Sequence, residues 1–279
     1  MSYKIVVDSC GELTEEMKKS SVFETASLSM EVDGTVIVDD ETFNQADFLK
    51  RVAASPQCPK SSCPSPKDYM ERYHCDAERV YAVTLSAELS GSYNSAELGK
   101  KLYAEEYGEK DIYVFNSRSA SIGETLIAMK IQECEELNMS FGEVIDTVEE
   151  YIAGQHTYFV LETLDTLRKN GRLTGIKAVV ASALNIKPVM GAKPEGVICQ
   201  LGQARGMKKA LAKMADHIVE DAENPQEKIL AISHCNCPQR AKEVQEMLVS
   251  RMKVKSSFIV DTAGISTMYA SDGGIIVVI

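Results

Sequence analysis

Residues 80–98, VYAVTLSAELSGSYNSAEL, contain a strand, a polar turn and the start of a helix in direct succession. Val80–Leu85 is an apolar, β-branched run typical of a buried parallel strand. Ser90, Gly91 and Ser92 follow where a helix leaves its first backbone N–H groups unpaired. Gly91 permits close approach of a ligand, and the serine hydroxyls add donors at the positive end of the helix dipole. The stretch therefore fits a carboxylate or a phosphate, although an ordinary serine N-cap has the same pattern.

Two further apolar runs end in the same kind of turn. Asp8-Ser9 follows the run 3–7, and the polar stretch 116–121 follows the run 111–115 and precedes a long helix. Because parallel strands place their carboxyl ends at one edge of a sheet, these turns are expected to meet there. The pattern predicts a doubly wound parallel sheet with a ligand site along that edge.

Two insertions interrupt the predicted parallel sheet. The pair Asp33-Gly34 is a hairpin signal, so residues 25–38 are expected to form a small β-ribbon. Residues 55–66 contain four prolines and are expected to form an extended loop without regular structure. This loop carries Ser61 and Ser62 and immediately precedes the unit with the central strand, so we expect it to lie over the same edge.

The pattern of elements changes after residue 153. Strands are expected at 158–161, 197–201, 229–233, 258–261 and 273–279, helices at 163–169, 207–222 and 238–252, and an apolar stretch at 178–184. Hairpin-like and crossover connections alternate here, which favours a mixed sheet with helices on one face. We therefore expect an α/β protein with two domains, residues 1–155 and residues 156–279, and a ligand between them.

The composition narrows the functional classes. A net charge of -11, without a basic stripe, argues against a nucleic-acid partner. The N-terminus has no signal-peptide pattern and no apolar run reaches bilayer length, so a cytoplasmic protein without an integral membrane segment is expected. The eight cysteines are then expected to be reduced. His234-Cys235-Asn236-Cys237 lacks a second pair of ligands at finger-like spacing, so no metal is expected.

The motifs of common enzymes are missing as well. Glu88–Ser92 lacks the first glycine of a nucleophile elbow, and the chain contains neither a phosphate-binding P-loop nor an evident magnesium cluster. We expect no catalytic residue and no cofactor. Two alternatives to a small-molecule carrier stay open: an enzyme or sensor that acts on a phosphorylated small molecule at the same helix N-terminus, and a module that binds a protein partner.

Several motifs, taken in order and at their separations, resemble the DegV family of fatty-acid-binding proteins. They are Asp8-Ser9, Ser61–Pro66, Leu89–Tyr93, Asn116-Ser117, Gly171–Leu173, Lys187-Pro188 and Ala204–Gly206. The resemblance covers nearly the whole chain. It implies a bacterial, non-catalytic carrier that holds one long-chain fatty acid in a tunnel between two α/β domains. Such proteins present the carboxylate to a separate kinase subunit, which makes an acyl phosphate, and their cargo is compatible with transient membrane contact.

The resemblance also implies roles for single residues. Ser61 or Ser62 matches one hydroxyl contact to the carboxylate, and Ser90 with the Gly91 amide matches the second, beside Ser92. Arg172 and Arg205 match arginines at which the kinase docks.

The chain departs from the family pattern at two positions. Cys63 replaces a glutamine that is common in the family. Thr262 stands where members often carry a histidine beside the carboxylate, so Thr262 is itself expected to contact the carboxylate. The second change bears on the kinase-linked reaction rather than on lipid binding. We expect Tyr269 or Thr267 to help complete the pocket.

Overall fold

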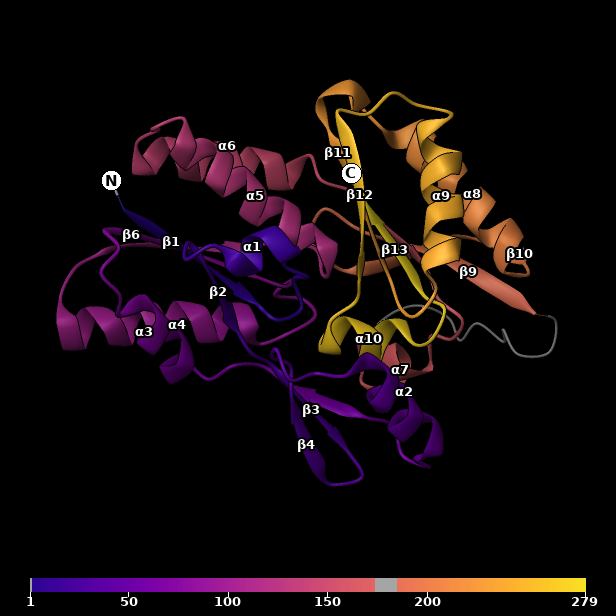
Figure 1. Cartoon of the computed structure of the whole chain (residues 1–279), viewed down its shortest axis with the longest axis horizontal. Coiled ribbons are helices and arrows are strands. Elements are labelled where there is room, and N and C mark those ends of the chain that lie inside the picture. Colours follow the sequence, from indigo (N-terminus) through magenta and orange to yellow (C-terminus); the bar gives the residue numbers. More distant parts are fainter. Residues whose placement is uncertain (1, 174–184) are drawn as a thin grey trace.

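A parallel sheet and a mixed sheet organise the computed structural model, which describes residues 2–173 and 185–279 (Figure 1). The apolar stretch 178–184 lies outside the described residues. The first sheet has the strand order β2-β1-β6-β7, and every neighbouring pair is parallel. Its strands are β1 (Tyr3–Asp8), β2 (Phe23–Ala26), β6 (Arg79–Thr84) and β7 (Asp111–Asn116). The predicted parallel sheet is confirmed, with its most buried strand, β6, in the interior.

Helices cover both faces of this sheet, as expected of a doubly wound arrangement (Figure 1). One face packs against α3 (Pro66–Tyr73) and α4 (Ser92–Tyr107). The other packs against α1 (Glu15–Lys19), α5 (Ile122–Glu136) and α6 (Phe141–Ala153). Local sequence fixes several helix starts, because α3 and α6 each begin with a capping box, made by Ser65 with Asp68 and by Ser140 with Glu143.

A small antiparallel sheet, β4-β3-β5, lies beside the first one. Its strands are β3 (Ser29–Val32), β4 (Thr35–Val38) and β5 (Lys60–Ser62), and α2 (Gln45–Ala54) connects β4 to β5. The hairpin turn at Asp33-Gly34 is confirmed. Two expectations are wrong here. Residues 25 and 26 of the predicted ribbon belong instead to β2 of the parallel sheet. Residues 60–62 of the proline-rich loop form a strand that pairs with residues 29–31.

The second large sheet has six strands in the order β10-β9-β8-β13-β11-β12. Its strands are β8 (Thr157–Val160), β9 (Ile186–Ala192), β10 (Ile198–Arg205), β11 (Ile229–His234), β12 (Ser256–Asp261) and β13 (Ile275–Val278). The β11–β12 pair is parallel and the other pairs are antiparallel, so the mixed sheet is confirmed.

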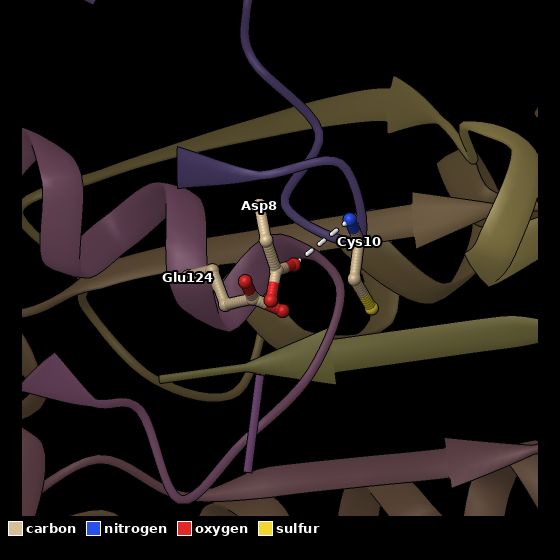
Figure 2. Close-up of side chains that lie close together, drawn as sticks. All are labelled: Asp8, Cys10 and Glu124. Atoms are coloured by element: carbon tan, nitrogen blue, oxygen red, sulfur yellow. Dashed lines mark hydrogen bonds between the residues drawn. The ribbon is translucent and has the colours of Figure 1, made fainter. Parts of the chain in front are cut away.

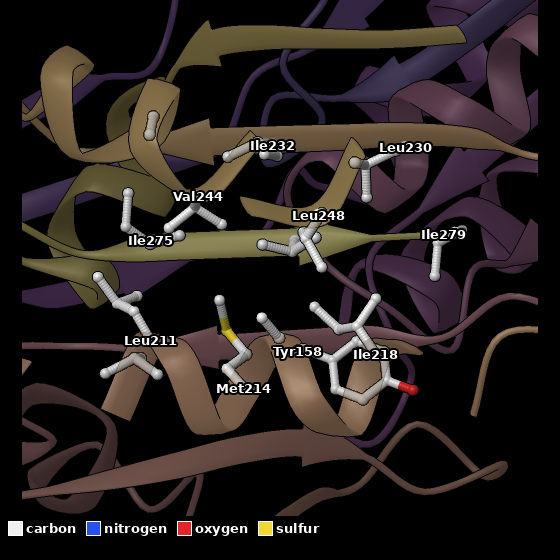
Figure 3. Packing of buried hydrophobic residues seen from close by; sticks show 14 of the residues in the cluster. Tyr158, Leu211, Met214, Ile218, Leu230, Ile232, Val244, Leu248, Ile275 and Ile279 are labelled. Carbon is white, nitrogen blue, oxygen red and sulfur yellow. The ribbon is translucent and has the colours of Figure 1, made fainter. Parts of the chain in front are cut away.

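One face of the mixed sheet is covered by α8 (Met207–Asp221) and α9 (Pro238–Val249), which are joined through a short 3-10 turn, Pro225–Glu227, and β11. Figure 3 shows Met214 and Ile218 of α8 and Val244 and Leu248 of α9 packing against this sheet. The opposite face meets α5, where Ile122 and Leu126 share a buried cluster with Ala231 and Val278 of the sheet. Two short helices, α7 (Asp165–Lys169) and α10 (Gly264–Ala270), lie below it near α2, and the sequence did not predict α10 (Figure 1).

The chain passes from the first sheet to the second between the end of α6 at Ala153 and the start of β8 at Thr157. The expected domain boundary at residues 155 and 156 falls in this connection. His156 and Ile279 exchange two backbone hydrogen bonds of 2.8 and 3.1 Å, which hold the connection against the C-terminus.

Candidate functional site

A largely apolar cavity of about 310 Å³ lies between the two large sheets. Leu85 and Leu89 line it from the end of β6, and Phe159, Ile198 and Ile276 line it from the mixed sheet. Its size falls within the range of small-ligand pockets, about 300–1,000 Å³. Because Leu85 and Leu89 follow β6, the cavity lies at the carboxyl ends of the parallel strands. The polar turns of the sequence were expected to form a site there.

Hydroxyl groups gather at one part of this wall. Ser61, Ser62, Ser90 and Gly91 all line the cavity, so the structure brings together these predicted contacts from two distant segments. Ser90 Oγ accepts a hydrogen bond of 3.2 Å from the Ser92 backbone N–H at the start of α4. A Cβ atom at Gly91 would lie 3.3 Å from the Cys63 sulfur, so glycine lets the two segments approach closely.

Tyr269 completes this polar group from α10. Its hydroxyl lies 2.9 Å from Ser61 Oγ, and its side chain lines the cavity. Burial raises the pKa of Tyr269, while the bond to Ser61 and the charge of Arg172 oppose that rise. The phenol is therefore neutral at physiological pH and can donate a hydrogen bond. Thr267, the other residue suggested from the sequence, is fully buried and bonds to Thr262 at 2.7 Å instead.

Ser92 and Thr262 are not brought to the cavity. The Ser92 hydroxyl is buried, donates to Asp8 Oδ2 at 2.6 Å and lies 2.7 Å from the Tyr69 hydroxyl. Thr262 is buried too and bonds through its hydroxyl to Gln45 at 3.1 Å and to Thr267. Both hydroxyl groups are thus occupied within the protein, and neither residue lines the cavity.

The two arginines expected at a docking surface lie in different surroundings. Arg172 is half-buried and lines the cavity, where its Nε donates to the Leu89 carbonyl at 3.1 Å, next to the serine turn. It also bonds to the carbonyl of Asn170. Arg205 is exposed at the end of β10. Arg172 therefore supplies positive charge to the cavity wall, while Arg205 alone of the two has an exposed side chain.

Behind the cavity lies a buried acidic group that the sequence did not indicate. The polar atoms of Asp8, Cys10 and Glu124 lie within 4.8 Å of one another, and all three side chains are buried (Figure 2). Glu12 lies beside them, and burial raises its pKa to about 7. The spacing resembles that of a metal centre, yet both Asp8 oxygens already accept hydrogen bonds, so we interpret Asp8 and Glu124 as a carboxyl pair.

The cysteine pair near residue 235 forms no comparable group among the described residues. Cys237 N–H donates to His234 Nδ1 at 3.3 Å, and Cys237 Sγ bonds to the carbonyl of Gly274 at 3.5 Å. Burial raises the pKa of both thiols to about 11, so they are protonated at neutral pH. Across residues 2–173 and 185–279, no helix has the length and apolar character needed to cross a bilayer.

Comparison with known proteins identifies the family. The model of the family described as "Uncharacterised protein, DegV family" matches residues 2–279. A DegV domain-containing protein of Streptococcus gordonii is 31% identical over 278 residues, covering 99% of this chain and 98% of that protein. A crystal structure of a DegV family protein from Ruminococcus gnavus, refined with vaccenic acid, is 66% identical, with a TM-score of 0.98 over 100% of this chain and 99% of that one.

A second solved structure is that of the fatty acid kinase (Fak) B3 protein of Streptococcus pneumoniae loaded with linoleic acid. It is 29% identical, with a TM-score of 0.91 over 100% of this chain and 99% of that one. The sequence and the structure of this chain both match these relatives over nearly the full length of each chain. This chain belongs to the DegV family.

Proposed function

We propose that this protein is a non-catalytic carrier of one long-chain fatty acid. The observation that carries the proposal is the cavity itself, which combines a largely apolar wall with a polar group made by Ser61, Ser62, Ser90, Arg172 and Tyr269. Further polar residues line it elsewhere, namely Arg118, Ser119, Ser121, Thr157 and Ser266. The acyl tail lies along the apolar wall, and the carboxylate accepts hydrogen bonds from the hydroxyls near the charge of Arg172. The fatty acids in the Ruminococcus gnavus and Streptococcus pneumoniae structures support this assignment.

The two parts of the ligand have different energetic roles. A tail of about 16 carbons, buried at about 0.8 kcal/mol per CH₂ group, contributes about 12 kcal/mol before ordering costs. Each hydrogen bond to the carboxylate contributes about 1.5–3 kcal/mol, part of which is offset by desolvation. The tail therefore supplies affinity, and the polar group selects and orients the head. That division suits a carrier that accepts several related tails.

The carrier presents its cargo to a separate kinase subunit in this proposal. Streptococcus pneumoniae Fak B3 is named as a fatty acid kinase protein, and the exposed Arg205 is the residue we assign to docking. The protein itself then needs no cofactor and works in the cytoplasm, in keeping with eight free cysteines. The alternative, a phosphorylated small molecule at the start of α4, leaves the long apolar wall without a ligand group to cover it.

Native mass spectrometry of freshly purified protein tests the proposal. We expect one fatty acid per chain, identified after extraction, and reloading of the delipidated protein by oleate. The matched competitor is a short phosphorylated compound such as glycerol 3-phosphate. Binding of that compound, together with refusal of added oleate, would replace the carrier by a phosphate-binding protein.

A further inference from the structure

One buried carboxylate holds both ends of the turn that carries Ser90 and Gly91. Asp8 Oδ2 accepts from the Leu85 backbone N–H at 2.9 Å and from the Ser92 hydroxyl at 2.6 Å. These two residues flank the turn at 86–91. Asp8 Oδ1 accepts a third bond of 3.1 Å from the Cys10 N–H, and the Asp8 side chain has no exposed surface. The position of the turn therefore depends on a charge at the end of β1.

Glu124 of α5 faces this carboxylate. Figure 2 shows the two carboxyl groups turned toward each other beside Cys10. Glu124 is fully buried, and neither of its oxygens has a hydrogen-bond partner in the described part of the chain. Two carboxylates cannot both be ionised at this separation in a buried site. Asp8 receives three donated hydrogen bonds and Glu124 receives none, so the charge belongs on Asp8 and a proton on Glu124.

Among the described residues, the titratable groups that face this pair are all acids, so none of them favours moving the negative charge from Asp8 to Glu124. Glu124 faces Asp8, Glu12 and Cys10, whose ordinary charged forms are all negative. Asp8 also faces Asp39 and Tyr69, which are acids as well. Burial and the nearby carboxyl groups raise the pKa of Glu124 well above its ordinary value. A hydrogen bond donated by protonated Glu124 to Asp8 also gives a partner to a Glu124 oxygen that otherwise has none among the described residues.

We propose that protonated Glu124 donates a hydrogen bond to Asp8, and that this pair is the positioning element that fixes the serine turn for the fatty-acid carboxylate. The inference rests on the proposed function. Ionisation of Glu124 places a second negative charge against Asp8, loosens the turn and adds repulsion toward an anionic head group. Binding of a fatty acid is then weaker at high pH, while binding of an uncharged ligand with the same tail is not.

The test measures oleate against oleyl alcohol, which has the same tail and an uncharged head. Affinities of the delipidated full chain for both are measured from about pH 6 to about pH 9, and their ratio is the readout, because a general loss of packing lowers both affinities alike. In Asp8→Asn we expect the oleate affinity to fall about tenfold or more and the alcohol affinity to change less than about twofold. Ser92→Ala, which keeps the carboxylate, serves if Asp8→Asn does not fold, and we expect it to lower the same ratio.

Glu124→Gln keeps a donor toward Asp8 and cannot ionise. We expect it to retain the wild-type ratio near neutral pH and to lose the decline at high pH, whereas the exposed Glu136→Gln on the same helix keeps that decline. An unchanged ratio in both Asp8→Asn and Ser92→Ala, or a decline at high pH that persists undiminished in Glu124→Gln, would overturn the inference. So would a metal ion retained by the wild type and lost in Glu124→Gln, since a cation would then balance the acids. Failure of the wild type to bind oleate at all would instead refute the proposed function.

Discussion

Glu12 makes the stability of this protein depend on pH, and Glu12→Gln is the change that reveals it. The side chain is buried, Oε2 accepts from Ser121 Oγ at 2.7 Å, and Oε1 has no partner in the described part of the chain. Burial raises the pKa of Glu12 from 4.5 to about 7. The folded state therefore holds the proton more tightly than the unfolded chain, so its stabilising contribution is complete below about pH 4.5 and is lost as the pH rises through about 7.

The size of this loss follows from the shift. A rise of about 2.5 pKa units, at about 1.4 kcal/mol per unit, lowers the free energy of unfolding by about 3 kcal/mol between about pH 4.5 and about pH 8. Glutamine keeps the shape and an acceptor for Ser121 but does not titrate. We therefore expect the loss between acidic and alkaline pH to be about 3 kcal/mol smaller in Glu12→Gln than in the wild type.

Urea unfolding of the delipidated protein at about pH 5, 6, 7 and 8 measures this difference. Delipidation is necessary because a bound ligand raises stability by mass action. Glu16→Gln on α1 is the matched control, since Glu16 is exposed. Parallel pH profiles for the wild type and Glu12→Gln would refute the reasoning, because the proton would then be held equally in both states.

Four further variants test the site and its surroundings. Ser90→Ala should weaken oleate binding about threefold to tenfold through loss of one hydroxyl contact, measured by calorimetry, and unchanged affinity would exclude Ser90 from the head-group site. Gly196→Ala should cost about 1–3 kcal/mol of stability, because its Cβ would lie 2.3 Å from Ser86 Oγ and 2.8 Å from Arg118 Cα; a urea midpoint equal to that of the wild type would contradict this packing argument. Arg205→Glu should impair phosphorylation of the cargo by a kinase partner without changing lipid content, whereas Arg172→Glu should lower lipid content; the reverse pattern would contradict the assignment of both arginines.

Much of the fold could be predicted because its signals are local. The three polar turns after apolar runs indicated the edge of the parallel sheet, and Asp33-Gly34 indicated the hairpin between β3 and β4. The sequence did not predict β2, β5, β9 or α10, which form by pairing or packing with other segments of the chain. Residues 60–62 become a strand by pairing with residues 29–31. The N-terminus of α10 is held by Asp39, whose carboxylate accepts from the N–H groups of Gly264 and Ile265 at 2.7 and 2.8 Å.

At the site, the sequence predicts the chemistry of the side chains but not their orientation. A helix start rich in serine predicts hydroxyl donors, but the local pattern cannot tell which hydroxyl faces a ligand and which is bound inside the protein. Ser90 lines the cavity, and Ser92, two residues later, is turned inward by Asp8 and Tyr69. Glu124 posed the same difficulty, because an acid in the first turn of α5 is also what a solvated helix start prefers. Its partner is Asp8, 116 positions earlier in the chain. A head-group site of this kind is therefore specified by two sets of residues, those that touch the ligand and those that hold them in place, and only the tertiary structure separates the sets.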